Sequence, residues 1–162
     1  MTRERRRGLP WILRDRAFWA AVLIGVALMA AVDEIVFHQL LGWHHLLDRA
    51  TPQIGLLSDG LLHAAEVVGL AAGGFLLADA HRRRAIGRRV ATAGVLCGMG
   101  AFQLFDAVVD HKLLRIHQIR YGVDLLPYDV AWVASAVALL AAGAVACALA
   151  SPPRRPGPPA VS

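Results

Sequence analysis

An all-α integral membrane protein, built as a four-helix transmembrane bundle, is the fold class that this sequence predicts. Of its 162 residues, 57% are hydrophobic, and the mean hydropathy of +0.51 is higher than soluble domains of this size carry. Four apolar stretches each reach the roughly 20 residues that a helix needs to cross a bilayer. The basic residues fall between these stretches in an uneven way that is typical of multi-pass membrane proteins.

The four expected helices follow one another with short connections and form one membrane domain, residues 17–150. Pro52 can start the second helix and Pro127 the fourth, because proline is tolerated in a first helical turn. The polar stretch HRRRAIGRR (81–89) separates the second helix from the third. The expected spans are residues 17–41, 53–80, 90–116 and 127–150.

The two ends of the chain lie outside this domain. Residues 1–16 are basic and are expected to stay in the cytoplasm. They resemble the start of a signal peptide, but no clear A-x-A pattern follows, so cleavage is not expected. The Pro-rich tail, residues 151–162, has no apolar periodicity and is expected to be disordered.

The basic residues predict an orientation. Thirteen of the seventeen Lys and Arg residues are expected on one side of the membrane, in residues 1–16, 81–89 and the tail. Cytoplasmic segments carry such an excess, so both termini and the 81–89 connector are predicted to face the cytoplasm. The net charge of +5 therefore reflects topology and contacts with lipid headgroups, and it does not indicate nucleic-acid binding. The predicted location is the inner (plasma) membrane, with multiple spans.

A polar motif occurs twice, each time after sixteen uncharged residues. DEIVFHQLLGWHH (33–45) and DAVVDHKLLRIHQ (106–118) both match D-x4-H-x5-H, at an offset of 73 residues. Further along, LLSD (56–59) resembles LPYD (126–129), at an offset of 70. The sequence therefore predicts two copies of a helical hairpin, related by an axis along the membrane normal. The two predicted copies are residues 17–80 and 90–150.

Ionisable side chains inside a membrane need partners or bound cations, because an isolated charge there costs at least a few kcal/mol. At 100° per residue, Asp106, Asp110 and His117 share one face of the third helix, whereas His111 points about 140° away. If such faces point inward, four helices surround a polar cavity. The ten predicted metal ligands are Asp33, His38, His44, Asp59, His63, Asp106, Asp110, His111, His117 and Asp129.

Carboxylates and neutral imidazoles are ligands for zinc, iron, manganese or Cu(II). Their number leaves two arrangements open: two or more ions, or one ion whose ligands are held by hydrogen-bonded neighbours. Cys97 and Cys147 lie in apolar stretches, and no Met joins the polar layer, which argues against Cu(I). Neither E-x-x-H nor H-E-x-x-H occurs, which excludes ferritin-type and zincin-type sites. The residues expected to orient ligands are Glu34, His45, Glu66 and Gln103, with Glu34 and Glu66 as candidate acid/base groups.

Two other readings of the polar layer stay open. A structural network of Asp–His pairs explains single residues, but not so many in one layer, because packed apolar residues would usually serve as well. A proton or ion pathway would carry polar groups across the whole membrane, whereas the predicted cytoplasmic half of each span is apolar. A site open to the outside is therefore favoured.

The run GMGAFQLFDAVVDHKLLRIHQIRYGVDLLPYDVAW (98–132), with DEIVFHQLLGWHH before it, resembles a bacterial family of small four-span membrane proteins, domain of unknown function 2243. The likeness covers about residues 17–150 and implies a bacterial inner-membrane protein. The family's association with cytochrome oxidase assembly genes implies metal handling or respiratory metal chemistry. More distantly, Ser, Asp and His near one membrane face are similar to zinc hydrolases of the alkaline-ceramidase type, although their seven spans and H-x-x-x-H are missing here.

The sequence thus predicts a membrane metal-binding protein with a His/Asp site in the outer leaflet, at the periplasmic or extracellular face. It would handle metal or carry out metal-dependent chemistry there. A membrane metal-dependent hydrolase and a proton or metal-ion transporter are the alternatives, and enzymatic activity stays open. The expected partners are the lipid bilayer, respiratory or metal-trafficking membrane proteins and further copies of the chain.

Overall fold

The computed structural model describes residues 9–83 and 87–150, and within these residues every regular element is a helix. Four of these helices are long and apolar enough to cross a membrane, which confirms the predicted all-α, four-span class. Residues 1–8 and the tail at 151–162 lie outside the described residues, so the expectations for them stay predictions. The elements in chain order are α1 (Leu9–Ile12), α2 (Arg16–Asp33), η2 (Glu34–Leu40), α3 (Pro52–Arg82), α4 (Arg88–Phe105), η3 (Asp106–Leu113) and α5 (Leu126–Leu149).

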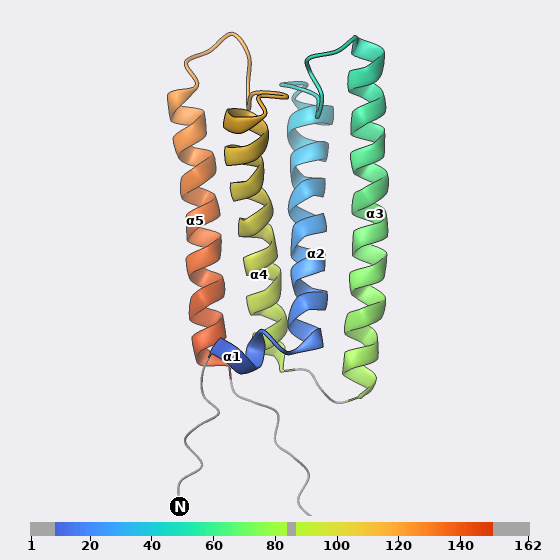
Figure 1. The fold of residues 1–162 in the computed structure, drawn as a ribbon, viewed down its shortest axis with the longest axis vertical. Helices are drawn as coiled ribbons and strands as arrows, with labels where there is room; N and C mark the ends of the chain where they lie inside the picture. Colours follow the sequence, from blue (N-terminus) through green and yellow to red (C-terminus); the bar gives the residue numbers. More distant parts are fainter. Residues whose placement is uncertain (1–8, 84–86, 151–162) are drawn as a thin grey trace, which may run out of the picture.

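The four long helices stand side by side in one layer, in the order α5, α4, α2, α3 (Figure 1). The central pair is α2 and α4, with α3 packed on α2 and α5 packed on α4 at the opposite edges. The edge helices leave more of their surface exposed than the central pair. The expectation that four helices surround a cavity is therefore wrong. The polar groups lie between α2 and α4 and along the seam between α2 and α3 instead.

Two glycines allow α2 and α4 to form the centre of this layer. A Cβ on Gly25 would lie 2.1 Å from the carbonyl oxygen of Val95, and a Cβ on Gly98 would lie 2.2 Å from that of Val22. No side chain tolerates such contacts with a backbone atom, so the close approach of the two helices requires glycine at both positions. The two glycines are 73 residues apart, and so are the two valines.

The C-terminal ends of α2 and α4 widen into the π-helices η2 and η3. The amide of Leu41 donates to the carbonyl five residues earlier at 2.9 Å, and the amide of Leu114 does the same at 2.7 Å. A turn closed over five residues brings side chains five apart onto one face, which a helix of ordinary pitch does not. The pairs brought together in this way are Asp33 with His38 and Asp106 with His111.

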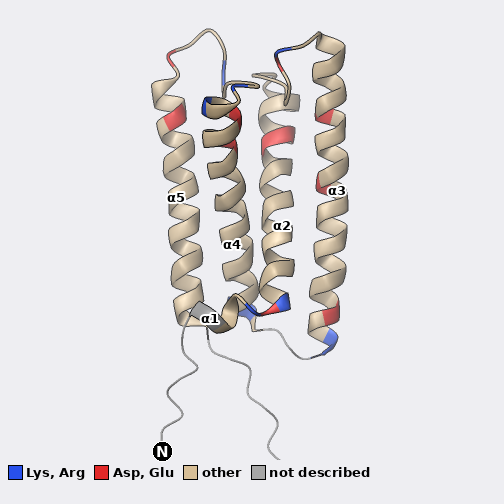
Figure 2. Cartoon of the chain, viewed as in Figure 1, with Lys and Arg blue, Asp and Glu red and all other residues tan. Residues whose placement is uncertain are grey.

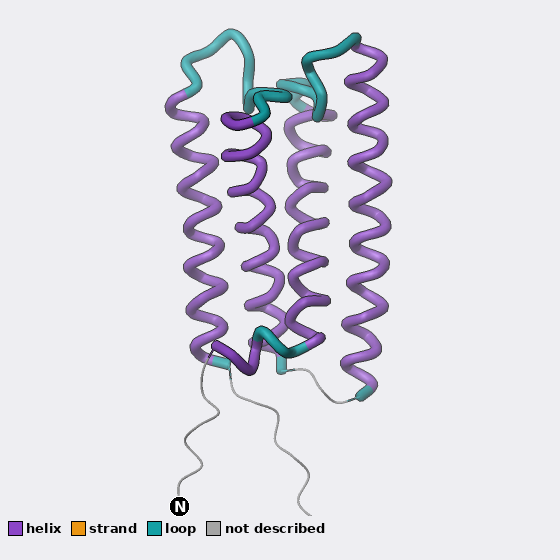
Figure 3. Tube along the Cα trace, in the orientation of Figure 1, coloured by secondary structure: helices purple, strands orange, loops and turns teal. Residues whose placement is uncertain are grey.

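The two ends of the layer differ in polarity (Figure 2). Most acidic residues of the helices gather toward the loops 41–51 and 114–125, each of which joins the two helices of one hairpin at this end (Figure 3). The opposite end carries arginines and an apolar cluster that joins α1, α2, α4 and α5 around Ile12, Phe18 and Val90. The first and last described helices meet at this arginine-bearing end. Which end faces the cytoplasm stays a prediction.

Candidate metal centre

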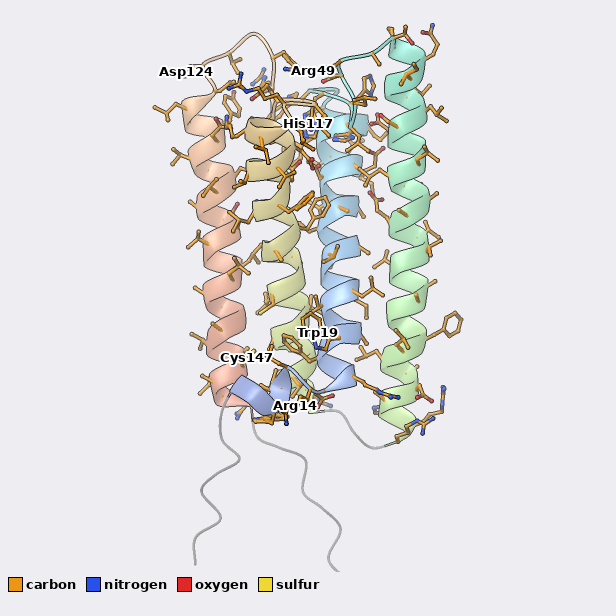
Figure 4. The ribbon with its side chains drawn as sticks, viewed as in Figure 1. Arg14, Trp19, Arg49, His117, Asp124 and Cys147 are labelled. Atoms are coloured by element: carbon orange, nitrogen blue, oxygen red, sulfur yellow. The ribbon has the colours of Figure 1, made fainter. Side chains whose placement is uncertain are left out.

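Four histidine rings pack together where η2, η3 and the loops that follow them meet. His38 and His44 belong to the first half of the chain, His111 and His117 to the second, and all four are 1% to 4% exposed. The rings of His44 and His117 stack with 4.6 Å between centroids. Within each half, the centroids are 4.4 Å and 4.8 Å apart. Figure 4 shows His117 at the loop end of the layer, near the tops of α2 and α4.

Each histidine pair has an aspartate beside it. The first triad is Asp33, His38 and His44, and the second triad is Asp106, His111 and His117. In each triad, one ligand atom per residue lies within 4.8 Å of the others, and all three residues are buried. Three side chains at this spacing can converge on a single ion.

Main-chain carbonyls fix one ring in each triad, and they do so across the two halves. His44 donates its Nδ1–H to the carbonyl of Ile119, and His117 donates its Nδ1–H to the carbonyl of Leu46, both at 3.0 Å. Because a carbonyl oxygen can only accept, Nδ1 must carry the hydrogen in both rings. A neutral ring then presents the lone pair of Nε2 to the interior. Histidine ligands of metals are usually held in this way by a backbone carbonyl or a carboxylate.

Several buried nitrogens of the triads have no hydrogen-bond partner among the described residues. They are Nε2 of His38, Nε2 of His44 and both ring nitrogens of His111. Each unpaired buried polar atom costs about 1–3 kcal/mol, and folded proteins contain few of them. A cation at each triad would satisfy the Nε2 atoms that face the aspartates.

The pKa values of the two stacked rings are shifted in opposite directions. Burial, together with the charges of His38, His117 and His111, lowers the pKa of His44 to about 2, so this ring is neutral. Burial also acts to lower the pKa of His117, but the hydrogen bond and the charge of Asp106 outweigh it and raise the pKa above its ordinary value. Nε2 of His117 lies 3.2 Å from Oδ1 of Asp106. A proton or a metal cation is therefore needed between these two atoms.

Further carboxylates adjoin the first triad. Asp59 of α3 accepts hydrogen bonds from Nδ1 of His38 at 3.1 Å, from Nδ1 of His45 at 2.5 Å and from the amide of Leu46 at 2.7 Å. Oε2 of Glu34 lies 2.7 Å from the same Nδ1 of His38. Since one ring nitrogen can give only one hydrogen, the two carboxylates compete for it. Glu34, His38 and Asp59 form a third buried group with the spacing of metal ligands.

Glu66 continues this acidic seam along α3. It is 2% exposed, its Oε1 has no hydrogen-bond partner in the described part of the chain, and its Oε2 lies 3.2 Å from Nδ1 of His63. The side chain of His63 is 58% exposed, and the structure does not bring this predicted ligand into any of the three groups. Glu34, Asp59 and Glu66 are called the acidic extension below.

The residue that contacts the second triad from α5 is not the aspartate that the sequence predicted. Asp129 forms an ion pair with Lys112 and belongs to none of the three groups, so it does not take the role of Asp59. At an offset of 73 residues, Asp59 aligns with Trp132, whose Nε1 donates to Oδ2 of Asp106 at 2.9 Å. Sequence reasoning missed Trp132, and a constant offset of 73 was the signal that could have found it.

Two remaining predicted residues lie beside the second triad. Asp110 is half-buried and belongs to none of the three groups. Gln103, which was expected to orient a ligand, donates to the carbonyl of Trp132 at 3.2 Å and to Oγ of Ser135 at 2.6 Å. The side chain of Gln103 thus ties α4 to α5 at Trp132, the residue whose indole donates to Asp106.

These features define a class of protein: a multi-pass helical membrane protein with buried His/Asp groups that could hold metal. The chain belongs to the family described as predicted membrane protein (DUF2243), which matches residues 20–149. The resemblance seen in the sequence is therefore confirmed. No curated protein and no solved structure matches the chain.

Proposed function

We propose that this protein binds transition-metal ions at the two triads, in the outer leaflet of the membrane. The observation that carries the proposal is the set of buried imidazole nitrogens that lie beside aspartates and have no hydrogen-bond partner among the described residues. Ligands of this kind suit zinc, iron, manganese or Cu(II). Cys147 belongs to the apolar cluster at the other end, with Cys97 packed against it, so thiolates contribute nothing at the triads.

Two triads of the same composition favour two ions, one for each. Each has one carboxylate and two imidazoles, which is the number of protein ligands that catalytic zinc sites use while leaving a position for water or substrate. Such an open position would permit chemistry at the metal, and it would equally permit transfer of the ion to a partner. Metal handling and metal-dependent chemistry therefore share one site.

We further propose that the halves 17–80 and 90–150 are copies of one hairpin, with both termini in the cytoplasm. Matching contacts 73 residues apart support the repeat: the glycine approaches between α2 and α4, and the crossed hydrogen bonds of His44 and His117. The arginines at the end opposite the triads support the orientation, because cytoplasmic ends carry excess positive charge.

A one-sided site is favoured over a conduit. The end opposite the triads is closed by the apolar cluster around Ile12, Phe18 and Val90. A pathway for protons or metal ions would need polar groups there. Handling or chemistry at the outer face therefore ranks above transport, and a metal-dependent hydrolase is the enzymatic form of the proposal.

Elemental analysis of the purified full chain, prepared without chelators, tests the proposal. We expect at least one ion per chain in the wild type, and two when both triads are filled. Replacing His111 and His117 by alanine should remove the ion of the second triad. His81→Ala is the matched control, because His81 lies in the last turn of α3, at the opposite end. Less than one ion per wild-type chain, or equal loss in the control, would contradict metal binding at the triads.

A further inference from the structure

A polar cleft opens between the two outer loops, above the stacked rings. Its volume is about 540 Å³, and His44 forms part of its wall. Residues from both loops line it, including Asp48, Arg49, Arg115, Gln118 and Tyr121. We name this space the loop cleft. It lies beyond the ends of the spans at Leu40 and Leu113, where lipid headgroups meet water.

The positive groups of the loop cleft come from opposite sides. Arg49 belongs to the first loop, where Figure 4 shows it at the same end of the layer as His117, and Arg115 belongs to the second loop. Arg115 has a φ of 52°, and its counterpart 73 residues earlier is Gly42, with a φ of 58°. A residue other than glycine costs about 1–2 kcal/mol in this conformation. Such strain concentrates at functional positions, and here it places a guanidinium at the cleft.

Two of the residues that line the cleft carry a buried acceptor atom. Oδ2 of Asp48 and Oε1 of Gln118 have no hydrogen-bond partner among the described residues. The amide of Asp48 donates to the carbonyl of Ile116 at 3.2 Å, which joins the two loops, and Nε2 of Gln118 donates to the carbonyl of His111 at 2.9 Å, which holds this side chain in place. A ligand with N–H groups would satisfy both acceptors.

Donors and acceptors in one cleft require a ligand with both charges. We propose that the loop cleft binds a phosphate group linked to a primary ammonium, as in phosphoethanolamine, either free or as a lipid headgroup. The phosphate lies on Arg49 and Arg115, since guanidinium groups match phosphate oxygens with paired hydrogen bonds. The ammonium lies on Asp48 and Gln118. The proposal goes beyond metal binding and does not require it.

This assignment predicts selectivity among phospholipids. Phosphatidylethanolamine supplies the phosphate and three N–H donors. Phosphatidylcholine has a quaternary ammonium without N–H groups, and phosphatidylglycerol has no cation, so each leaves the buried acceptors unpaired. A charge-assisted hydrogen bond is worth about 1.5–3 kcal/mol, so we expect the ethanolamine lipid to bind about tenfold more tightly or better.

Native mass spectrometry of the full chain in detergent, with equal amounts of the three lipids, tests the proposal. Asp48→Asn should abolish the preference for the ethanolamine lipid, and Arg49→Gln and Arg115→Gly should each weaken its binding about tenfold. Lys112→Gln is the matched control, because Lys112 pairs with Asp129 outside the cleft. Metal content and thermal unfolding are measured on the same samples, metal-free and metal-loaded. Lipid binding and metal binding at the triads can therefore succeed or fail independently.

Soluble glycerophosphoethanolamine distinguishes the two sources of the ligand. Competition with the lipid shows that the headgroup alone is recognised, and a lipid preference without competition assigns the cleft to membrane lipid. Direct binding of the soluble compound that Arg49→Gln weakens, without lipid selectivity, assigns the cleft to a free ligand. Equal retention of the three lipids together with no binding of the soluble compound would overturn the proposal, as would equal loss in Lys112→Gln.

Discussion

The first and second triads share their ring positions, their crossed carbonyl partners and their spacing of 73 residues, but their surroundings differ in charge. Beside the first triad lies the acidic extension, whose three carboxylates are all buried. The residues at the matching positions of the second half are Ala107, Trp132 and Leu139. There, Asp106 receives a hydrogen bond from an indole, and the neighbouring Asp110 is only half-buried.

This difference teaches that a common backbone can present the same three ligands to two ions of unequal affinity. Carboxylates near a cation strengthen its binding, and the neighbours that hold a ligand in place typically change metal affinity by 10- to 100-fold. We therefore expect a tight site at the first triad and a weaker, more exchangeable site at the second. The four predictions below test the shared part of this comparison and then its differences.

The largest effect is expected where the halves are most alike. Gly25→Ala and Gly98→Ala each place a Cβ within about 2 Å of a backbone oxygen, so both should lower the free energy of unfolding by about 3 kcal/mol. Thermal unfolding in detergent measures this. Gly74→Ala is the control, since nothing lies within 4 Å of its Cβ, and it should stabilise α3 by about 1 kcal/mol. If Gly25→Ala and Gly98→Ala lowered the free energy of unfolding by very different amounts, the two halves would not be packed alike.

The second prediction separates the triads by affinity. Asp59→Asn removes the carboxylate that holds His38 and should weaken the first ion about 100-fold. Trp132→Phe removes one hydrogen bond to Asp106 and should weaken the second ion only about 10-fold. Competition with a metal indicator of known affinity measures both. If Asp59→Asn changed the weaker ion instead, the assignment of the tight site to the first triad would be wrong.

The third prediction concerns the pH dependence of stability in the metal-free protein. The pKa values of the matching residues His44 and His117 are shifted in opposite directions. The folded pKa of His44 is about 2, below the ordinary 6.5, so unfolding takes up a proton and stability falls as the pH drops below 6.5. The slope approaches about 1.4 kcal/mol per pH unit. The folded pKa of His117 is raised, so its contribution is complete below pH 6.5 and is lost as the pH rises through the folded value.

Glutamine variants measured across a pH series in the presence of a chelator separate these two effects. His44→Gln should flatten the loss of stability on the acid side of pH 6.5. His117→Gln should flatten the loss on the alkaline side of the same point. Both variants changing the same side would show that the two rings titrate alike, contrary to their different neighbours.

The smallest effect is expected at the loops, where the halves differ by one residue. Arg115→Gly relieves a left-handed backbone conformation and should raise the free energy of unfolding by about 1 kcal/mol. Gly42→Ala introduces the same strain in the first half and should lower it by about 1 kcal/mol. Chemical denaturation of both variants measures the pair. Equal destabilisation by both substitutions would mean that Arg115 makes contacts worth more than its strain.

The sequence predicts the four spans and all six residues of the two triads because long apolar runs and the D-x4-H-x5-H motif are local signals. It does not predict how the ligands converge, since a wheel drawn at 100° per residue places His111 away from Asp106 and Asp110 beside it. The π-helix η3 reverses these two assignments. Nothing in the local sequence marks a turn closed over five residues before the tertiary structure is known.

The arrangement of the four helices in a single layer also cannot be predicted from local sequence patterns. Gly25 and Gly98 are visible in the sequence, but their effect depends on which helices meet, and that depends on the packing of the whole chain. Asp129 was assigned to the site because LPYD resembles LLSD, although its offset of 70 departs from the 73 of the motif. Trp132, at the constant offset, carries the side chain that reaches Asp106.

X-ray absorption spectroscopy of the metal-loaded protein tests the central claim most directly, because it reports the atoms bound to the ion. We predict that nitrogen and oxygen atoms bind the ion at about 2.0–2.2 Å for zinc, with the outer scattering of imidazole. The imidazole signal should fall when His111 and His117 are replaced by alanine and should not change in His81→Ala. A sulfur shell at about 2.3 Å, or a spectrum without imidazole, would contradict metal binding by the two triads.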